Sequence, residues 1–394
     1  MNNRELFFKH IGQTSPFPLA IEISKAEGVF IEDTQGKKYI DFISGIAVSN
    51  VGHCHPDVIK AITEQANRYM HTMVYGEYIQ SPQVQLAHLL SSNLPSNLQS
   101  VYFVNSGAEA IDGALKLAKR YTKRTELISF KNSYHGSTHG PLSIMGSESY
   151  KNAFRPLLPN TKLIEFNKLN DLEQITNETA CVVVEPIQGE AGVILPENDY
   201  LQKLQKKCNQ TGALLIVDEI QTGCGRTGSL WAFESYQIIP DILCLAKGLG
   251  GGMPIGAFIS SNEIMSTLTH HPILGHITTF GGHPVCCAAS FASLSYILNE
   301  NLAEAAKKKG EYFLSKLIHP MFQKRRGKGL MISIPMDNNF VLMKFIQLAL
   351  ERGIIVDWFL FADSALRICP PLIISKNELD WVAEQFNQIA ELLD

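Results

Sequence analysis

Residues 214–228 read LLIVDEIQTGCGRTG, an apolar run that leads into a glycine-rich loop. Residues 223–228 match the pattern G-x-G-x-x-G, which binds dinucleotides when it follows a strand and opens a helix. The next segment, SLWAFESYQIIP, is short and ends at Pro240, so it leaves little room for the helix whose N-terminus would hold a pyrophosphate. Asp241 has a suitable spacing for a ribose contact but precedes the next strand. An NAD-dependent oxidoreductase is therefore only a remote alternative.

Outward from this stretch, short β-rich runs alternate with helical patterns. The runs are SVYFVN, ELISF, TKLIEF, CVVVEP, LLIVDEI and DILCLA. Several are almost continuously apolar, which is typical of strands covered on both faces. Strands that alternate with helices predict an α/β fold with a mostly parallel central sheet, flanked by helices and built with right-handed crossovers.

The two ends of the chain have a different pattern. Residues 17–48 read as short strands separated by turn signals, and a long apolar helix pattern covers HPVCCAASFASLSYILNE. The remaining C-terminal part mixes helices with short strands such as GLMISIP and ALRICPP. We therefore predict a large domain at residues 51–285 and a smaller α+β domain built from both ends, residues 1–50 and 286–394.

Composition excludes several classes of function. The 394 residues carry a formal net charge of -4, which gives no electrostatic footprint for nucleic acid. No uninterrupted apolar stretch approaches the roughly 20 residues of a membrane span. The N-terminal MNNRELFFKH has no apolar signal core, and the eight cysteines are scattered, as reduced thiols are in a cytoplasmic protein. His53, Cys54 and His55 lack a second ligand cluster at zinc spacing, so we predict no metal.

Two charged residues end apolar strands. Asp218 follows LLIV, and Lys247 follows DILCLA and precedes a run of glycines, GLGGG. A cap or turn acid explains one such aspartate, and a surface lysine explains one such lysine. The presence of both residues at the ends of successive strands, where open α/β sheets bind ligands, favours a ligand-binding site. A desolvated lysine is also a Schiff-base nucleophile.

This pair matches the needs of pyridoxal 5'-phosphate. A carboxylate keeps the pyridine nitrogen protonated, and a lysine carries the aldehyde between turnovers. The cofactor also needs a phosphate site, which VNSGAEA provides: a strand ends, and Ser106, Gly107 and Ala108 begin a helix whose free N–H groups attract an anion.

The motifs together resemble the class III pyridoxal-phosphate aminotransferases, the group of acetylornithine, ornithine and 4-aminobutyrate aminotransferases. The resemblance runs from about Gly28 to Pro371 through DFISGIAVSNVGHCHP, NSGAEA, SYHG, EPIQGEAGV, VDEIQTGCGRTG, AKGLGGGMPIGA, TTFGGHPVCCAA and LRICPPL. It implies fold type I of the pyridoxal-phosphate enzymes. It also implies that the G-x-G-x-x-G loop follows the pyridinium aspartate and holds no nucleotide.

The resemblance assigns roles to single residues. Lys247 matches the Schiff-base lysine, Asp218 the partner of the ring nitrogen, and Gln221 the residue near the ring hydroxyl. Tyr134 falls where the family stacks an aromatic ring on the cofactor. Thr279 matches a threonine that reaches the phosphate from a neighbouring subunit, which implies a homodimer with composite active sites.

Four residues bear on the substrates. Arg367 matches the arginine that holds the α-carboxylate of glutamate or 2-oxoglutarate, and Glu190 matches the acid that pairs with it when an ω-amine donor binds. Ser137 stands where ornithine-type members have an arginine, and Phe30 where they have a tyrosine. Both departures remove polar contacts for the distal end of an amino-acid donor. His135, His139 and Lys131 lie nearby in sequence and are candidates to supply the missing charge.

The resemblance implies an aminotransferase that moves an amino group from an ω-amino acid or amine to a 2-oxo acid, with ping-pong kinetics. The identity of the donor, and 2-oxoglutarate or pyruvate as acceptor, stay open. A decarboxylating or aminomutase relative of the same fold is the alternative, because one fold hosts several reactions.

Overall fold

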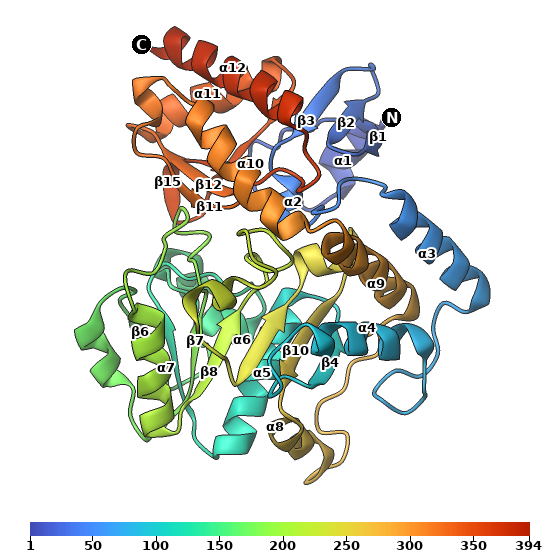
Figure 1. Cartoon of the computed structure of the whole chain (residues 1–394), viewed down its shortest axis with the longest axis vertical. Helices are drawn as coiled ribbons and strands as arrows, with labels where there is room; N and C mark the ends of the chain where they lie inside the picture. Colours follow the sequence, from blue (N-terminus) through green and yellow to red (C-terminus); the bar gives the residue numbers. More distant parts are fainter.

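The computed structural model describes residues 1–394, and its centre is a seven-stranded sheet (Figure 1). The strand order is β4-β10-β9-β8-β7-β5-β6. Only β10 runs antiparallel to its neighbours, so the predicted mostly parallel sheet is confirmed. The strands are β4 (Ser100–Val104), β5 (Glu126–Phe130), β6 (Thr161–Ile164), β7 (Thr179–Val184), β8 (Leu214–Asp218), β9 (Ile242–Leu245) and β10 (Gly256–Ser260).

Successive side chains of β8 enter two different hydrophobic cores. Leu215 and Val217 belong to one core, and Leu214 and Ile216 to the other. Helix α5 (Gly107–Thr122) packs on the sheet in the second core, and α7 (Tyr200–Thr211) packs in the first. Burial on both faces is the reason that these strands read as continuous apolar runs. The other helices around this sheet are α3 (Pro56–Arg68), α4 (Ser81–Ser92), α6 (His139–Ser143), α8 (Asn262–Ser266) and α9 (Pro284–Asn299).

Two smaller sheets join the ends of the chain. One has the order β1-β2-β3-β13, and its β3 pairs in parallel with β13, so residues near the N-terminus share a sheet with residues near 354. The other, β11-β12-β15-β14, is antiparallel. Figure 1 shows the blue N-terminal and red C-terminal elements together above the central sheet. The exact domain boundaries at residues 50 and 285 stay predictions.

The remaining elements are short or belong to the chain ends. The strands are β1 (Ile23–Glu27), β2 (Phe30–Asp33), β3 (Lys38–Asp41), β11 (Arg326–Lys328), β12 (Met331–Pro335), β13 (Ile354–Ile355), β14 (Asp357–Phe359) and β15 (Ala362–Ile368). The helices are α1 (Asn3–His10), α2 (Ser44–Ala47), α10 (Leu302–Lys316), α11 (Asn339–Glu351) and α12 (Lys376–Leu393). The 3-10 turns are η1 (Glu148–Tyr150), η2 (Asn152–Phe154), η3 (Leu169–Gln174), η4 (Ala232–Tyr236), η5 (Lys247–Gly250), η6 (Thr267–Thr269) and η7 (Pro320–Phe322).

In the structure, the G-x-G-x-x-G loop forms hydrogen bonds to backbone carbonyls of other segments of the chain. Only the short η4 follows it, as its sequence predicts. The buried Arg226 donates from Nη1 to the carbonyls of Leu330 at 3.1 Å and Pro370 at 2.5 Å, and from Nη2 to Asn50 Oδ1. The loop therefore ties the end of β8 to segments from both ends of the chain.

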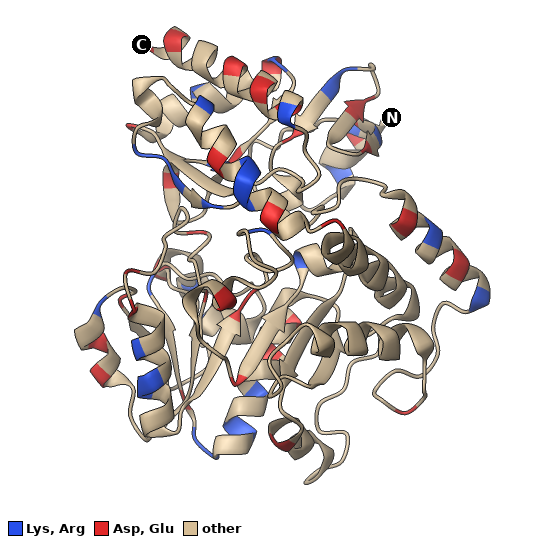
Figure 2. Ribbon diagram, in the orientation of Figure 1, with Lys and Arg blue, Asp and Glu red and all other residues tan.

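The surface carries charges of both signs. Figure 2 shows acidic and basic residues alternating along α3. None of the helices combines the length and apolar character that crossing a bilayer requires. The histidines of GHCHP have local partners: His53 Nε2 lies 2.9 Å from Asp41 Oδ2, and His55 Nδ1 accepts from the Asp57 N–H at the start of α3.

Candidate active site

A cavity of about 440 Å³ lies where the strands of the central sheet end. Its lining follows the carboxyl ends of β4, β5, β7, β8 and β9, the position at which open α/β sheets bind ligands. The cavity brings together nine of the residues singled out in the sequence: Ser106, Gly107, Ala108, Tyr134, Ser137, Glu190, Asp218, Gln221 and Lys247. Arg367 lies behind Glu190, whereas Thr279 and Phe30 lie elsewhere on the chain.

Lys247 stands at the turn between β9 and η5. Its backbone has φ of +47°, a left-handed conformation that side-chain-bearing residues rarely adopt. Such backbone strain persists at sites where the surrounding structure enforces it. The Lys247 side chain lines the cavity. Burial lowers the pKa of the Lys247 ammonium, although Glu190 and Asp218 oppose this shift. A lysine with a lowered pKa supplies a neutral, nucleophilic amine more readily.

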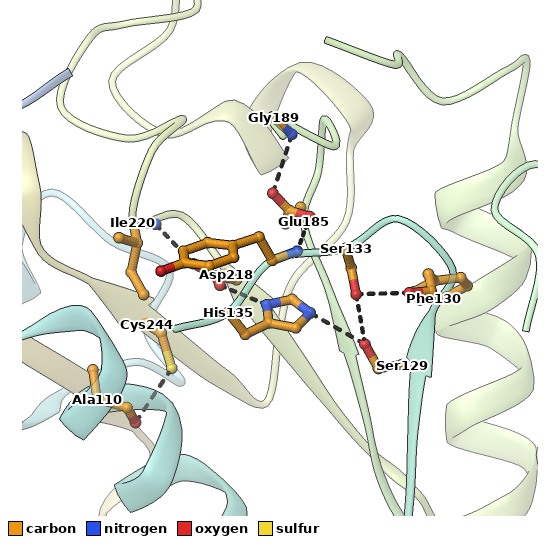
Figure 3. A network of polar contacts seen from close by, with 11 residues as sticks. Ala110, Ser129, Phe130, Ser133, His135, Glu185, Gly189, Asp218, Ile220 and Cys244 are labelled. Atoms are coloured by element: carbon orange, nitrogen blue, oxygen red, sulfur yellow. Dashed lines mark hydrogen bonds and ion pairs between the residues drawn. The ribbon is translucent and has the colours of Figure 1, made fainter. Parts of the chain in front are cut away.

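Asp218 is held from two sides (Figure 3). Its Oδ1 accepts from the Ile220 N–H at 3.0 Å, and its Oδ2 lies 2.7 Å from His135 Nδ1. The other ring nitrogen, His135 Nε2, lies 3.2 Å from Ser129 Oγ, which in turn contacts Ser133 Oγ at 2.9 Å. Both nitrogens of the buried imidazole are thus engaged, and the ring fixes the aspartate in place.

This geometry corrects the suggestion that His135 supplies a charge to the substrate. The ring is a positioning group for Asp218, and neither nitrogen is free. Lys131 is no substitute, since its Nζ pairs with Glu165 Oε1 at 2.5 Å. His139 is exposed at the start of α6 and is absent from the cavity lining.

Glu185 lines the cavity, and no sequence motif predicted a role for it. Its Oε1 accepts from the Gly189 N–H at 3.1 Å, and its Oε2 accepts from the Tyr134 N–H at 3.3 Å. Burial, followed by the nearby Asp218, raises the pKa of the Glu185 carboxyl well above its usual range. The signal was present in the sequence, because Glu185 follows the buried strand β7 as Asp218 ends β8.

The start of α5 lies at the cavity, where Ser106, Gly107 and Ala108 are part of the lining. Ser106 is the N-cap, and its Oγ accepts from the Glu109 N–H at 3.2 Å. The other N–H groups of the first turn have no partner within the helix, and the helix dipole favours negative charge there. Gly136 has φ of +127°, and a Cβ built on it comes within 2.8 Å of the Ala108 Cβ. The Tyr134–Gly136 loop therefore packs closely against this turn.

Glu190 and Arg367 form a buried, bidentate ion pair. Arg367 Nη1 donates to Glu190 Oε1 at 2.9 Å, and Nη2 donates to Oε2 at 2.7 Å. Nη2 also donates to the Trp358 carbonyl at 2.8 Å. The structure thus joins two residues that lie far apart in sequence, and Glu190 covers the face of Arg367 that a carboxylate would use.

At the position where ornithine-type members have an arginine, the cavity lining has Ser137. Ser137 Oγ lies 3.1 Å from Tyr134 Oη, and the lining includes no arginine. Phe30 does not line the cavity: it begins β2, is partly exposed, and lies in another pocket with Trp381 and Arg352. Within one chain, Phe30 therefore has no contact with the substrate site.

Comparisons with known proteins decide the family. The family model described as "Aminotransferase class-III" matches residues 12–390. The chain belongs to the class III aminotransferases. It is 39% identical to the acetylornithine aminotransferase of Methanopyrus kandleri, over 100% of this chain and 98% of the relative.

Solved structures agree with this family. The ornithine aminotransferase of Toxoplasma gondii superposes with a TM-score of 0.92 at 30% identity, covering 100% of this chain and 96% of that one. An (S)-enantioselective omega-transaminase of Thermomicrobium roseum gives a TM-score of 0.91 at 29% identity, covering 100% and 99% of the two chains.

This class III aminotransferase is an enzyme that depends on pyridoxal phosphate. Its cavity fits the cofactor on three observations from the chain itself. An amine with a lowered pKa is present at Lys247, a buried and doubly held carboxylate at Asp218, and a helix N-terminus for the phosphate at Ser106. The three groups line one cavity.

Proposed function

We propose that this aminotransferase takes its amino group from a plain amine or diamine and delivers it to 2-oxoglutarate. The observation that carries the proposal is an asymmetry in the site. Arg367 is in place behind Glu190, while the cavity lining includes Ser137 and no arginine. A site without a partner for a second carboxylate gains no specificity from it.

In this proposal the chain's own residues hold the cofactor and move protons. Pyridoxal phosphate, when bound, withdraws electrons from the donor carbon. Lys247 Nζ removes the proton from that carbon and returns it to a neighbouring position, as a general base and then an acid. Asp218, oriented by His135, stabilises the positively charged ring nitrogen. Gln221 would contact the ring hydroxyl and Tyr134 the face of the ring, and Ser106, Gly107 and Ala108 would hold the phosphate.

Arg367 and Glu190 distinguish the two halves of the reaction. While an amine donor occupies the cavity, Glu190 remains on Arg367 and neutralises it. When the 2-oxo acid enters, its carboxylate replaces Glu190 at Nη1 and Nη2, because two parallel N–H donors match one carboxylate. The two substrates therefore use the same space in turn, which gives ping-pong kinetics.

Acetylornithine is the second candidate for the donor, because the chain is 39% identical to an acetylornithine aminotransferase. A donor panel distinguishes the two. The enzyme is assayed with 2-oxoglutarate and with putrescine, 4-aminobutyrate, ornithine or acetylornithine in turn. We expect kcat/KM for the diamine to exceed that for acetylornithine by at least about tenfold, the effect of an unpaired buried charge. Acetylornithine as the best donor would contradict the proposal.

We also propose a homodimer in which Thr279 completes the phosphate site of the partner. Thr279 is exposed on its own chain, and its carbonyl accepts from His71 at 2.8 Å. Around it lies a patch of exposed apolar side chains: Ile79 at 96%, Tyr78 at 58%, Phe280 at 56% and Ile277 at 50% exposure. Exposed apolar patches of this kind mark interfaces. Light scattering that returned the 43.7 kDa of one chain would contradict the dimer.

The cytoplasm is the proposed location. All eight cysteines are free, and seven of them are buried, the state expected in a reducing compartment.

A further inference from the structure

Four polar side chains form one row across the antiparallel sheet behind Glu190. Arg326 on β11 pairs with Ser333 on β12, Ser333 pairs with Arg367 on β15, and Arg367 pairs with Asp357 on β14. Side chains directly opposite each other on antiparallel strands lie on the same face. The sheet therefore places an acid, Asp357, directly beside the arginine that faces the cavity.

Asp357 and Glu190 contact different edges of the same guanidinium. Glu190 takes both Nη atoms, whereas Asp357 Oδ1 lies 3.2 Å from Nε. The Asp357 side chain is 23% exposed, and neither its Oδ1 nor Arg367 Nε has another hydrogen-bond partner. Two carboxylates thus face one positive charge, and only Glu190 stands between that charge and the cavity.

Exchange of Glu190 for a substrate carboxylate leaves Asp357 where it is. Arg367 would still be held by Asp357, by the Trp358 carbonyl at 2.8 Å and by the face of the Phe359 ring at 4.7 Å. The guanidinium keeps its orientation, so the Nη atoms remain directed at the incoming acid. The cost is a negative charge within a few ångströms of an anion site, which weakens the binding of any carboxylate.

We propose that Asp357 is a specificity-determining residue that lowers the affinity of the Arg367 site for the carboxylate of the 2-oxo acid. This rests on the proposed function, in which Arg367 binds the acceptor. Weak carboxylate binding lets the amino-acid product leave before the next amine enters. Asp357 leaves the amine half-reaction unchanged, because the donor meets a site already covered by Glu190.

The Asp357 carboxyl gains or loses its negative charge in a mildly acidic pH range. Burial raises the pKa of Asp357 to about 6; Arg367 opposes the shift, and Glu190 and Asp41 add to it. Asp41 itself contacts His53 at 2.9 Å. Above pH 6 Asp357 is ionised and repels the acceptor, and below pH 6 it is neutral. The affinity for the 2-oxo acid should therefore rise as pH falls through this range.

The test measures KM for 2-oxoglutarate between pH 5.5 and 8 in the dimeric holoenzyme and in Asp357→Asn, with amine half-reactions followed separately by the visible absorbance of the cofactor. In the variant we expect KM at pH 8 to fall about fivefold, as for a partly screened charge a few ångströms away. Its pH dependence should disappear, and the amine half-reaction should keep its rate. Asp357→Glu restores the charge and the pH dependence. Asp363→Asn removes an exposed acid from the same hairpin and should change nothing.

An unchanged or higher KM in Asp357→Asn overturns the inference, since loss of a purely structural contact loosens Arg367 and weakens binding. If the variant fails to fold, the wild-type pH profile decides. A KM for 2-oxoglutarate that does not change between pH 5.5 and 8 also overturns the inference. A wild-type enzyme that accepts amines but never reacts with 2-oxoglutarate overturns the proposed function instead.

Discussion

The cofactor end and the substrate end of the cavity are built differently. At the cofactor end, Asp218 has two hydrogen-bond partners, Ile220 N and His135, and Ser106 caps the start of helix α5. At the substrate end, Arg367 is covered by Glu190, and the Ser137 hydroxyl hydrogen-bonds to Tyr134 Oη. In the proposed function, the groups that serve every turnover follow strands or begin a helix of the central domain, whereas substrate selection depends on the exchange of Glu190 for a substrate carboxylate. A change at the first end should affect all substrates, and a change at the second only some.

Lys247→Ala gives the largest effect and tests whether the cofactor end serves both half-reactions. Without the amine no group moves the proton of the donor carbon, so kcat should fall by about 10⁴-fold with every donor and acceptor. Steady-state rates with a diamine and with glutamate measure this. The matched control, Lys203→Ala, removes a surface lysine on α7 and should retain full activity. A loss confined to one half-reaction would show that Lys247 does not serve both halves of the reaction.

Asp218→Asn gives the next largest effect. An amide can still accept from Ile220, but it has no charge to stabilise the ring nitrogen. We expect kcat to fall about 10²- to 10³-fold for all substrates, the scale of losing one preorganised electrostatic contact. The cofactor content after dialysis, read from visible absorbance, should fall as well. Asp199→Asn, an exposed acid on the same domain, is the control. Normal rates with bound cofactor would show that Asp218 does not act on the ring.

The two ends also differ in how far the sequence predicts them. Asp218 and Lys247 were evident because each stands at the end of a strand whose apolar pattern is unambiguous, and carboxyl ends of parallel strands meet at one edge. The His135–Asp218 contact was not evident from the sequence, because it depends on how the loop after β5 folds back over β8. Glu185 was missed although it follows the apolar strand β7, because its partners are backbone N–H groups, which a side-chain motif does not identify.

Phe30 shows what a match to a family position leaves open. The residue matches a family position, but in a strand the facing of a side chain depends on the pleat, and a shift of one residue reverses it. Here Phe30 is the first residue of β2 and is 37% exposed. Likewise, the row of Arg367 and Asp357 follows from strand register, which apolar patterning leaves undetermined for short strands.

Ser137→Arg gives the smallest effect and tests the substrate end alone. Ser137 lines the distal side of the cavity, so an arginine there adds a positive charge where the carboxylate of acetylornithine would lie. We expect kcat/KM for acetylornithine to rise about tenfold, as one added charged contact at a partly exposed site allows, and that for a diamine to fall. Ser137→Gln has a similar length without the charge and should produce neither change. If the arginine altered all donors equally, it would be acting on the cofactor through Tyr134, whose Oη is 3.1 Å from Ser137 Oγ, and the separation between the two ends would not hold.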